Sequence, residues 1–102
     1  MRDPDSYYFR EFHIRGDMLA ALQRYVTERV PPGGFLRAVL AHDFMAACAQ
    51  ADDGNLRNLP AYAAYLYNEM PSSCHGSYDI VNQWLDTNHV REEGGAYADT
   101  AA

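Results

Sequence analysis

The chain has 102 residues, 48% of them hydrophobic and 22% charged, and 14 acids against 8 arginines give a formal net charge of −6. This length and composition indicate a single soluble globular domain. No apolar stretch approaches the roughly 18 residues that span a membrane, and the N-terminus lacks the apolar core of a signal peptide, so we expect a cytoplasmic protein. An acidic chain does not attract phosphate backbones through its overall field, which argues against direct nucleic-acid binding.

Hydrophobic spacing predicts an all-α fold, a small bundle of about four helices joined by short loops rich in proline and glycine. Asp17 and Ser77 are the predicted N-caps of the first and last helices, and Ser77 therefore has a structural role. PPGG at 31–34 turns the chain between the first two helices, and ADDGN at 51–55 is a predicted loop. The helices and their buried positions are 17–30 (Leu19, Leu22, Val26, Val30), 35–51 (Leu36, Val39, Leu40, Phe44, Ala47, Ala51), 58–70 (Leu59, Ala63, Leu66, Met70) and 78–88 (Ile80, Val81, Trp84, Leu85).

The two ends of the chain carry no such pattern. Residues 1–12 include Tyr7, Tyr8, Phe9 and Phe12, and their spacing leaves three interpretations open: an aromatic arm, a short strand or an extra helical turn. Residues 91–102 contain too little apolar surface to pack. We therefore expect a single helical domain at 1–90, followed by a disordered tail.

Asp43 falls in the middle of the apolar stripe of the second predicted helix, where a carboxylate needs partners. Three kinds of partner are open: backbone N–H groups at another helix start, such as 76–78; Arg15 or Arg29; and the indole of Trp84. Each would give Asp43 a structural role in fixing how the helices pack, and we favour that role over catalysis. Trp84 is assigned a structural role as well.

Metal or thiol chemistry would have to use Cys48, Cys74 and the histidines His42, His75 and His89. A structural zinc site needs two close ligand pairs, whereas only the adjacent Cys74 and His75 are close, so we predict no metal and no cofactor. Both thiols are expected to be reduced, with Cys48 at the edge of the core. Cys74 precedes a predicted helix start, which would lower the pKa of its thiol. A small thiol- or metal-dependent enzyme using Cys74 and a nearby histidine is therefore the alternative function.

The third predicted helix presents the candidate partner-binding residues. Tyr65 is predicted to point away from the buried stripe, with Tyr62 at its flank and Glu69 one turn further on. Exposed tyrosines among small side chains are typical of protein contact surfaces. Tyr7 and Tyr8 in the N-terminal segment form a second candidate element.

The chain contains a series of motifs in this order: PPGGFLRAVL at 31–40, Asp43, AD at 51–52, YLYN at 65–68, CHGS at 74–77 and Trp84. Over residues 14–85 this pattern resembles a family of small uncharacterised proteins of phages and prophages. The resemblance implies no chemistry, and family members carry other residues at the positions of His42 and His75. It implies a small non-enzymatic protein that binds a bacterial host protein. The most specific version of this expectation is inhibition of a defence system such as a CRISPR effector complex, an anti-CRISPR-like role. Whether the chain forms a homodimer is also left open.

Overall fold

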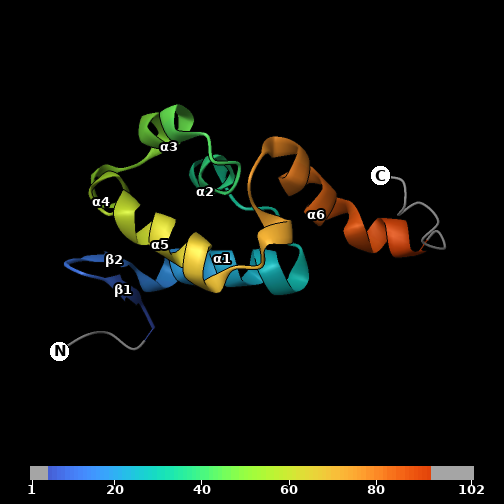
Figure 1. The fold of residues 1–102 in the computed structure, drawn as a ribbon, viewed down its shortest axis with the longest axis horizontal. Coiled ribbons are helices and arrows are strands. Elements are labelled where there is room, and N and C mark those ends of the chain that lie inside the picture. The colour runs from blue at the N-terminus through green and yellow to red at the C-terminus, as the bar shows by residue number, and fades with distance from the viewer. Residues whose placement is uncertain (1–4, 93–102) are drawn as a thin grey trace.

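The computed structural model describes residues 5–92, and side chains over 5–86. Most of this part is helical, as predicted, but a small antiparallel sheet means that the fold is not purely all-α. Figure 1 shows α5 between the hairpin and α1 on one side and α2 to α4 on the other, with α6 extending toward the C-terminal end. The elements are β1 (Tyr7–Phe9), β2 (Phe12–Ile14), α1 (Gly16–Glu28), α2 (Gly34–Leu40), α3 (Phe44–Gln50), α4 (Asp53–Arg57), α5 (Leu59–Glu69), the short 3-10 helix η1 (Ser72–Cys74) and α6 (Tyr78–Glu92).

The N-terminal segment is a β-hairpin, the strand interpretation among the three that its spacing left open. Phe9 pairs with Phe12 across the two strands, so only Arg10 and Glu11 form the turn. Arg10 takes a left-handed φ of 56°, a conformation that hairpin turns usually give to glycine or asparagine. Because this turn contains neither glycine nor asparagine, the sequence lacks the usual signal from which a hairpin is predicted.

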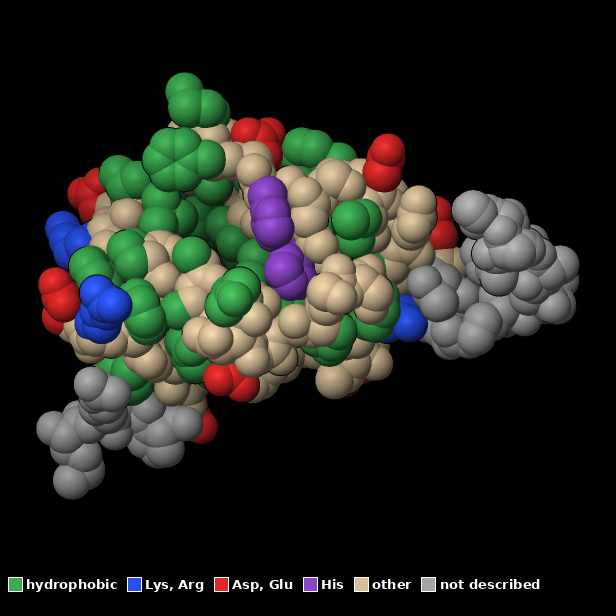
Figure 2. Space-filling view, in the orientation of Figure 1, with side chains coloured by type: hydrophobic (Ala, Val, Ile, Leu, Met, Phe, Trp, Pro, Cys, Tyr) green, Lys and Arg blue, Asp and Glu red, His purple; other side chains and the backbone are tan. Residues whose placement is uncertain are grey.

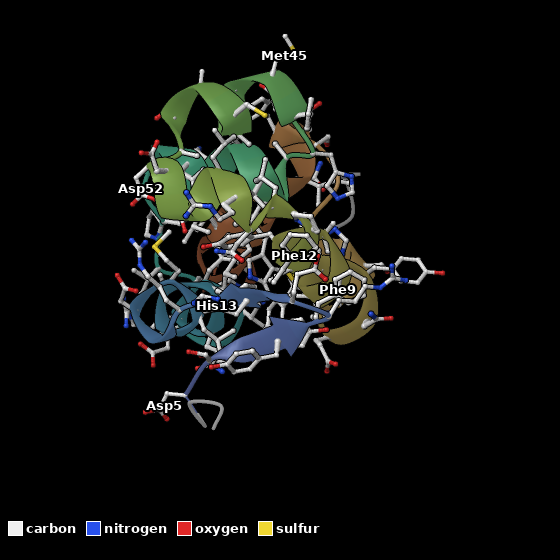
Figure 3. All side chains as sticks on the ribbon, turned by 90° about the vertical axis from the view of Figure 1, so that its left-hand side faces the viewer. Asp5, Phe9, Phe12, His13, Met45 and Asp52 are labelled. Atoms are coloured by element: carbon white, nitrogen blue, oxygen red, sulfur yellow. The ribbon has the colours of Figure 1, made fainter. Side chains whose placement is uncertain are left out.

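Helix α5 supplies the surface on which the hairpin packs. The ring of Tyr7 meets that of Tyr65 edge-on, with centroids 5.0 Å apart. The backbone N–H of His13 donates to Asn58 Oδ1, just before α5, at 2.9 Å. Figure 3 shows the hairpin from the left-hand side of Figure 1, with His13, Phe9 and Phe12 labelled. An isolated two-stranded hairpin is at best marginally stable, so these contacts hold it in place.

Helices α1 and α6 are joined through a buried tyrosine. The hydroxyl of Tyr25, whose side chain is fully buried, donates to the backbone oxygen of Cys74 at 2.7 Å. The indole N–H of Trp84 in turn donates to the backbone oxygen of Tyr25 at 2.9 Å, and the guanidinium of Arg29 lies 3.5 Å from the centre of the Trp84 ring. At the start of α6, Ser77 Oγ accepts the N–H of Ile80 at 3.1 Å, as an N-cap does.

The boundaries of α1 differ from the prediction at both ends. Arg15 is the N-cap, and Asp17 lies in the first turn, where its carboxylate accepts a hydrogen bond from Arg15 Nε at 2.8 Å. The helix ends at Glu28 because Arg29 takes a left-handed φ of 58°. Val30, predicted to be buried, is therefore beyond the helix and 40% exposed.

The second predicted helix, 35–51, is two helices with a break at 41–43. His42 takes a left-handed φ of 61°, and Asp43 begins α3 as its N-cap, with Oδ1 accepting the N–H of Ala46 at 3.1 Å. Asp43 is therefore not inside a helix stripe, and its backbone partner is in its own helix rather than at 76–78. The break also changes which face of α3 is buried: Ala47 is buried as predicted, but Phe44 is 68% exposed.

The remaining differences lie in the second half of the chain. The predicted loop at 51–55 contains the start of α4, because Asp52 Oδ1 accepts the N–H of Asn55 at 2.7 Å and caps a short helix. Helix α6 continues to Glu92, beyond the predicted end at 88. Residues 1–4 and 93–102 lie outside the described residues, as does most of the predicted tail.

Candidate functional site

An apolar groove of about 610 Å³ lies between α2, α3 and α5. Val39 of α2, Ala47 of α3, and Ala63 and Leu66 of α5 are among the side chains that line it. Figure 2 shows hydrophobic side chains gathered around this hollow, with two histidines directly beside it. The groove exists because the break at 41–43 redirects the chain, so that α3 does not continue α2.

Three large apolar side chains on α3 and α5, two of the helices that border this groove, are exposed. Phe44 and Tyr67, which line the groove, are 68% and 87% exposed. Met45, 75% exposed, projects from α3 away from the body of the molecule (Figure 3). Phenylalanine, tyrosine and methionine are enriched at protein interfaces, and clustered exposed apolar side chains mark binding surfaces. Neither Phe44 nor Tyr67 was a predicted contact residue. The exposure of Phe44 could have been predicted only by locating the helix break at 41–43.

His42 and His75 form a pair at the groove. Their facing ring nitrogens, His42 Nε2 and His75 Nδ1, are 2.9 Å apart and share one hydrogen bond. Burial and the neighbouring His42 lower the pKa of His75, although hydrogen bonds to the backbone of Met70 and Leu66 act in the opposite direction. His75 is therefore neutral at neutral pH. The sequence predicts one continuous helix through His42, and it did not predict this pair.

Two further contacts connect the break at 41–43 to the segment before α6. The hydroxyl of Tyr78 donates to Asp43 Oδ2 at 2.7 Å, and the N–H of Gly76 donates to the backbone oxygen of Leu40 at 2.8 Å. The Tyr78 hydroxyl, followed by the Ala46 N–H, lowers the pKa of Asp43, which is consequently ionised. Asp43 thus caps the start of α3 and links it to the start of α6. Its partners, the Ala46 N–H and the Tyr78 hydroxyl, differ from the three kinds of partner that the sequence left open.

Tyr62, a predicted partner-binding residue, is a core residue and the prediction that it is exposed is wrong. Its side chain is 1% exposed, and its hydroxyl donates to Asn55 Oδ1 at 2.7 Å. The Phe35 ring meets it edge-on at 5.2 Å. The apolar stripe could not reveal this burial because the hydroxyl needs a partner in α4, which the sequence analysis did not predict.

The other candidate contact residues are Tyr65 and Glu69 on α5 and Tyr7 and Tyr8 on the hairpin. Tyr65 is partly buried against Tyr7, and that burial raises the pKa of its hydroxyl. Tyr8 stacks on His13 with ring centroids 5.6 Å apart, whereas Glu69 is exposed. None of these four residues lines the groove, so the structure does not bring them together with Phe44. Their partner-binding role stays a prediction.

The thiol of Cys74 does not have the environment of a nucleophile. It is fully buried, its Sγ lies 3.1 Å from the backbone oxygen of Pro71, and burial raises its pKa to about 11. The expected lowering of this pKa is wrong, because the side chain packs into the core instead of facing the start of α6. Catalytic cysteines are accessible and have depressed pKa values.

Within residues 5–92, no group of three or more His, Cys, Asp or Glu side chains is arranged to hold a metal ion. No helix in that same range has both the length and the apolar character needed to cross a membrane. Comparison with models of known protein families, with curated proteins and with solved structures finds no match.

Proposed function

We propose that this protein acts by binding another protein, holding an amphipathic helix of that partner in the groove between α3 and α5. The observation that carries the proposal is the exposure of Phe44 and Tyr67 on an apolar groove. Such grooves accommodate the apolar face of a helix, with anchors spaced three or four residues apart. Holding a partner helix in this way requires no catalytic residue.

Charge indicates the kind of helix that fits. The chain carries a net charge of −6, and Asp43, which lines the groove, has a lowered pKa. Complementary charge speeds association and excludes wrong partners. The favoured occupant is therefore a helix with basic residues beside its apolar stripe.

The resemblance of residues 14–85 to phage and prophage proteins supports a bacterial host protein as the partner, encountered in the host cytoplasm. In its most specific form, the proposal is that this partner is a component of a defence system, such as a CRISPR effector complex. Occupation of a basic surface on that component would inhibit it sterically.

Affinity capture with matched variants tests the proposal. Phe44→Glu places a charge at the groove, whereas Val30→Glu places the same charge on an exposed apolar residue that does not line it. We expect wild type and Val30→Glu to capture the same bacterial protein and Phe44→Glu to lose it, with at least about ten-fold weaker binding to the purified partner, or about 1.4 kcal/mol. Capture unchanged by Phe44→Glu would refute the groove as the binding surface.

Sedimentation of the same three proteins separates host binding from self-association. If the wild type dimerises and Phe44→Glu is monomeric, the groove is filled by a second copy of the chain and the host-protein proposal is wrong. A wild-type monomer is the result that we expect.

A further inference from the structure

We propose that the hydrogen bond between His42 and His75 makes partner binding pH-sensitive. The bond holds the groove in its binding form at neutral pH and is lost in mild acid, when both rings are protonated. His42 belongs to the break at 41–43, His75 follows η1, and both line the groove. The pH response of the bond is a property of the free chain, whereas its effect on a partner rests on the proposed function.

The two rings are placed so that one added proton keeps their contact and a second breaks it. His42 Nε2 and His75 Nδ1 face each other at 2.9 Å, with the ring centroids 5.1 Å apart. A neutral imidazole has one N–H and one acceptor nitrogen, so one ring donates and the other accepts. The first added proton goes to the outer nitrogen of the donor ring and leaves the bond intact. The second must go to the accepting nitrogen, and two N–H groups and two positive charges then face each other.

The two histidines are the groups at this place that gain charge in mild acid. The other titratable or charged side chains on the surrounding elements are Arg37 on α2, Asp43 in the break, Tyr67 and Glu69 on α5, Cys74 on η1 and Tyr78 on α6. Only histidine has an ordinary pKa that puts its change of charge between about pH 5 and 8. Asp43 stays ionised because the Tyr78 hydroxyl, followed by the Ala46 N–H, lowers its pKa. Burial, and then the charge of His42, lowers the pKa of His75, so the second proton binds in mild acid rather than at neutral pH.

Separation of the rings affects the groove because the pair is part of the junction that borders it. Beside the pair, the Gly76 N–H donates to the backbone oxygen of Leu40 at 2.8 Å, and the Tyr78 hydroxyl donates to Asp43 Oδ2 at 2.7 Å. Together with the histidine bond, these contacts connect the break at 41–43 to the segment before α6. Loss of the histidine bond weakens that junction, and the two positive charges repel the basic helix that we propose as the occupant. Affinity for the partner therefore falls as the pH drops through the second protonation.

Hydrogen exchange of the full chain, without any partner, tests the response of the junction. The Gly76 amide reports on the junction through its bond to Leu40, and the Ala61 amide, which donates to the backbone oxygen of Asn58, reports on general loss of stability. NMR measurements from about pH 7.5 to about pH 5 give the protection factor of each amide, corrected for its intrinsic exchange rate.

Two variants keep a hydrogen bond at this place but cannot bind the second proton. In His75→Asn the amide oxygen replaces Nδ1 as the acceptor, and in His42→Gln the amide N–H replaces Nε2–H as the donor. His13→Gln is the matched control, because that ring stacks on Tyr8 in the hairpin and does not line the groove. Circular dichroism establishes that each variant is folded, and the wild-type measurement decides by itself if one is not.

We expect the protection of Gly76 relative to Ala61 to fall at least about ten-fold between about pH 7.5 and about pH 5 in the wild type and in the control. In His75→Asn and His42→Gln the ratio should stay constant. A wild-type ratio that does not change with pH, or an equal fall in both variants, would overturn the proposal.

The affinity for the captured partner at the same two pH values tests the effect on binding. The wild type and His13→Gln should bind at least about ten-fold more weakly at the lower pH, as the binding form becomes a minor state, and the two site variants should not. A wild-type affinity that is independent of pH would overturn the regulatory role even if Gly76 responds. If Phe44→Glu retains the partner, the proposed function fails instead, and the exchange measurement still decides whether the bond responds to pH.

Discussion

Tyr62→Phe tests most directly whether α5 is positioned as described, because it removes one oxygen atom and leaves the ring in place. The Tyr62 hydroxyl donates to Asn55 Oδ1 at 2.7 Å, and the side chains are 1% and 6% exposed. Without the hydroxyl, the Asn55 oxygen is buried with its donor removed. The loss of one partner from a buried hydrogen bond costs about 1–3 kcal/mol. The edge-on contact of the ring with Phe35 is retained, so no larger cavity term is added.

Urea denaturation followed by circular dichroism measures this cost. With an m value of about 2 kcal/mol per molar urea, the midpoint should fall by about 0.5–1.5 M while m is unchanged. Tyr67→Phe is the matched control, because Tyr67 is on the same helix but 87% exposed, and its midpoint should not move. Tyr62 is among the residues that line the groove, but the change removes only the hydroxyl bonded to Asn55, so partner capture should be unaffected. A variant as stable as wild type that has lost its partner would show that Tyr62 is a contact residue and that its assignment to the core is wrong.

Three further predictions follow from the described contacts. The folded pKa of His75 is lowered below its ordinary value, so the unfolded chain binds more protons; stability should fall as pH drops from about 7.5 to 5.5, and His75→Ala should flatten that dependence in urea titrations, whereas an equally steep curve would contradict it. Iodoacetamide should modify Cys48 well before Cys74, whose thiol is buried with a pKa of about 11; peptide mass spectrometry measures the order, and early labelling of Cys74 in folded protein would contradict its burial. Trp84→Phe removes the indole donor to the Tyr25 oxygen and should lower the free energy of unfolding by about 1 kcal/mol or more; an unchanged urea midpoint would mean that this link contributes nothing.

Some features of the fold depend only on residues that are close together in the sequence, and these features could be predicted. The prolines and glycines at 31–34 mark the turn after α1, and the apolar spacing of Leu19 and Leu22 identifies the buried face of that helix. Ser77 marks the start of α6 because its hydroxyl caps residues three positions away. These features need no knowledge of the rest of the fold.

The candidate site could not be predicted in the same way. Residues 35–51 have helical periodicity throughout, and Asp43 is as compatible with a helix surface as with a cap. Contacts with Gly76 and Tyr78, more than 30 positions away, accompany the break at 41–43. Both the groove and the histidine pair result from that break, so a helix-by-helix interpretation misses them together.

The dependence of the hairpin on α5 also sets an order of events during synthesis. Strands β1 and β2 leave the ribosome before their packing partners, Asn58 and Tyr65, which are made some 50 residues later. The hairpin cannot be stable alone, so this N-terminal segment stays unfolded until α5 has emerged. Folding of the domain is then a late and concerted event, and a nascent chain stalled before residue 58 should remain open to proteolysis throughout its N-terminal segment.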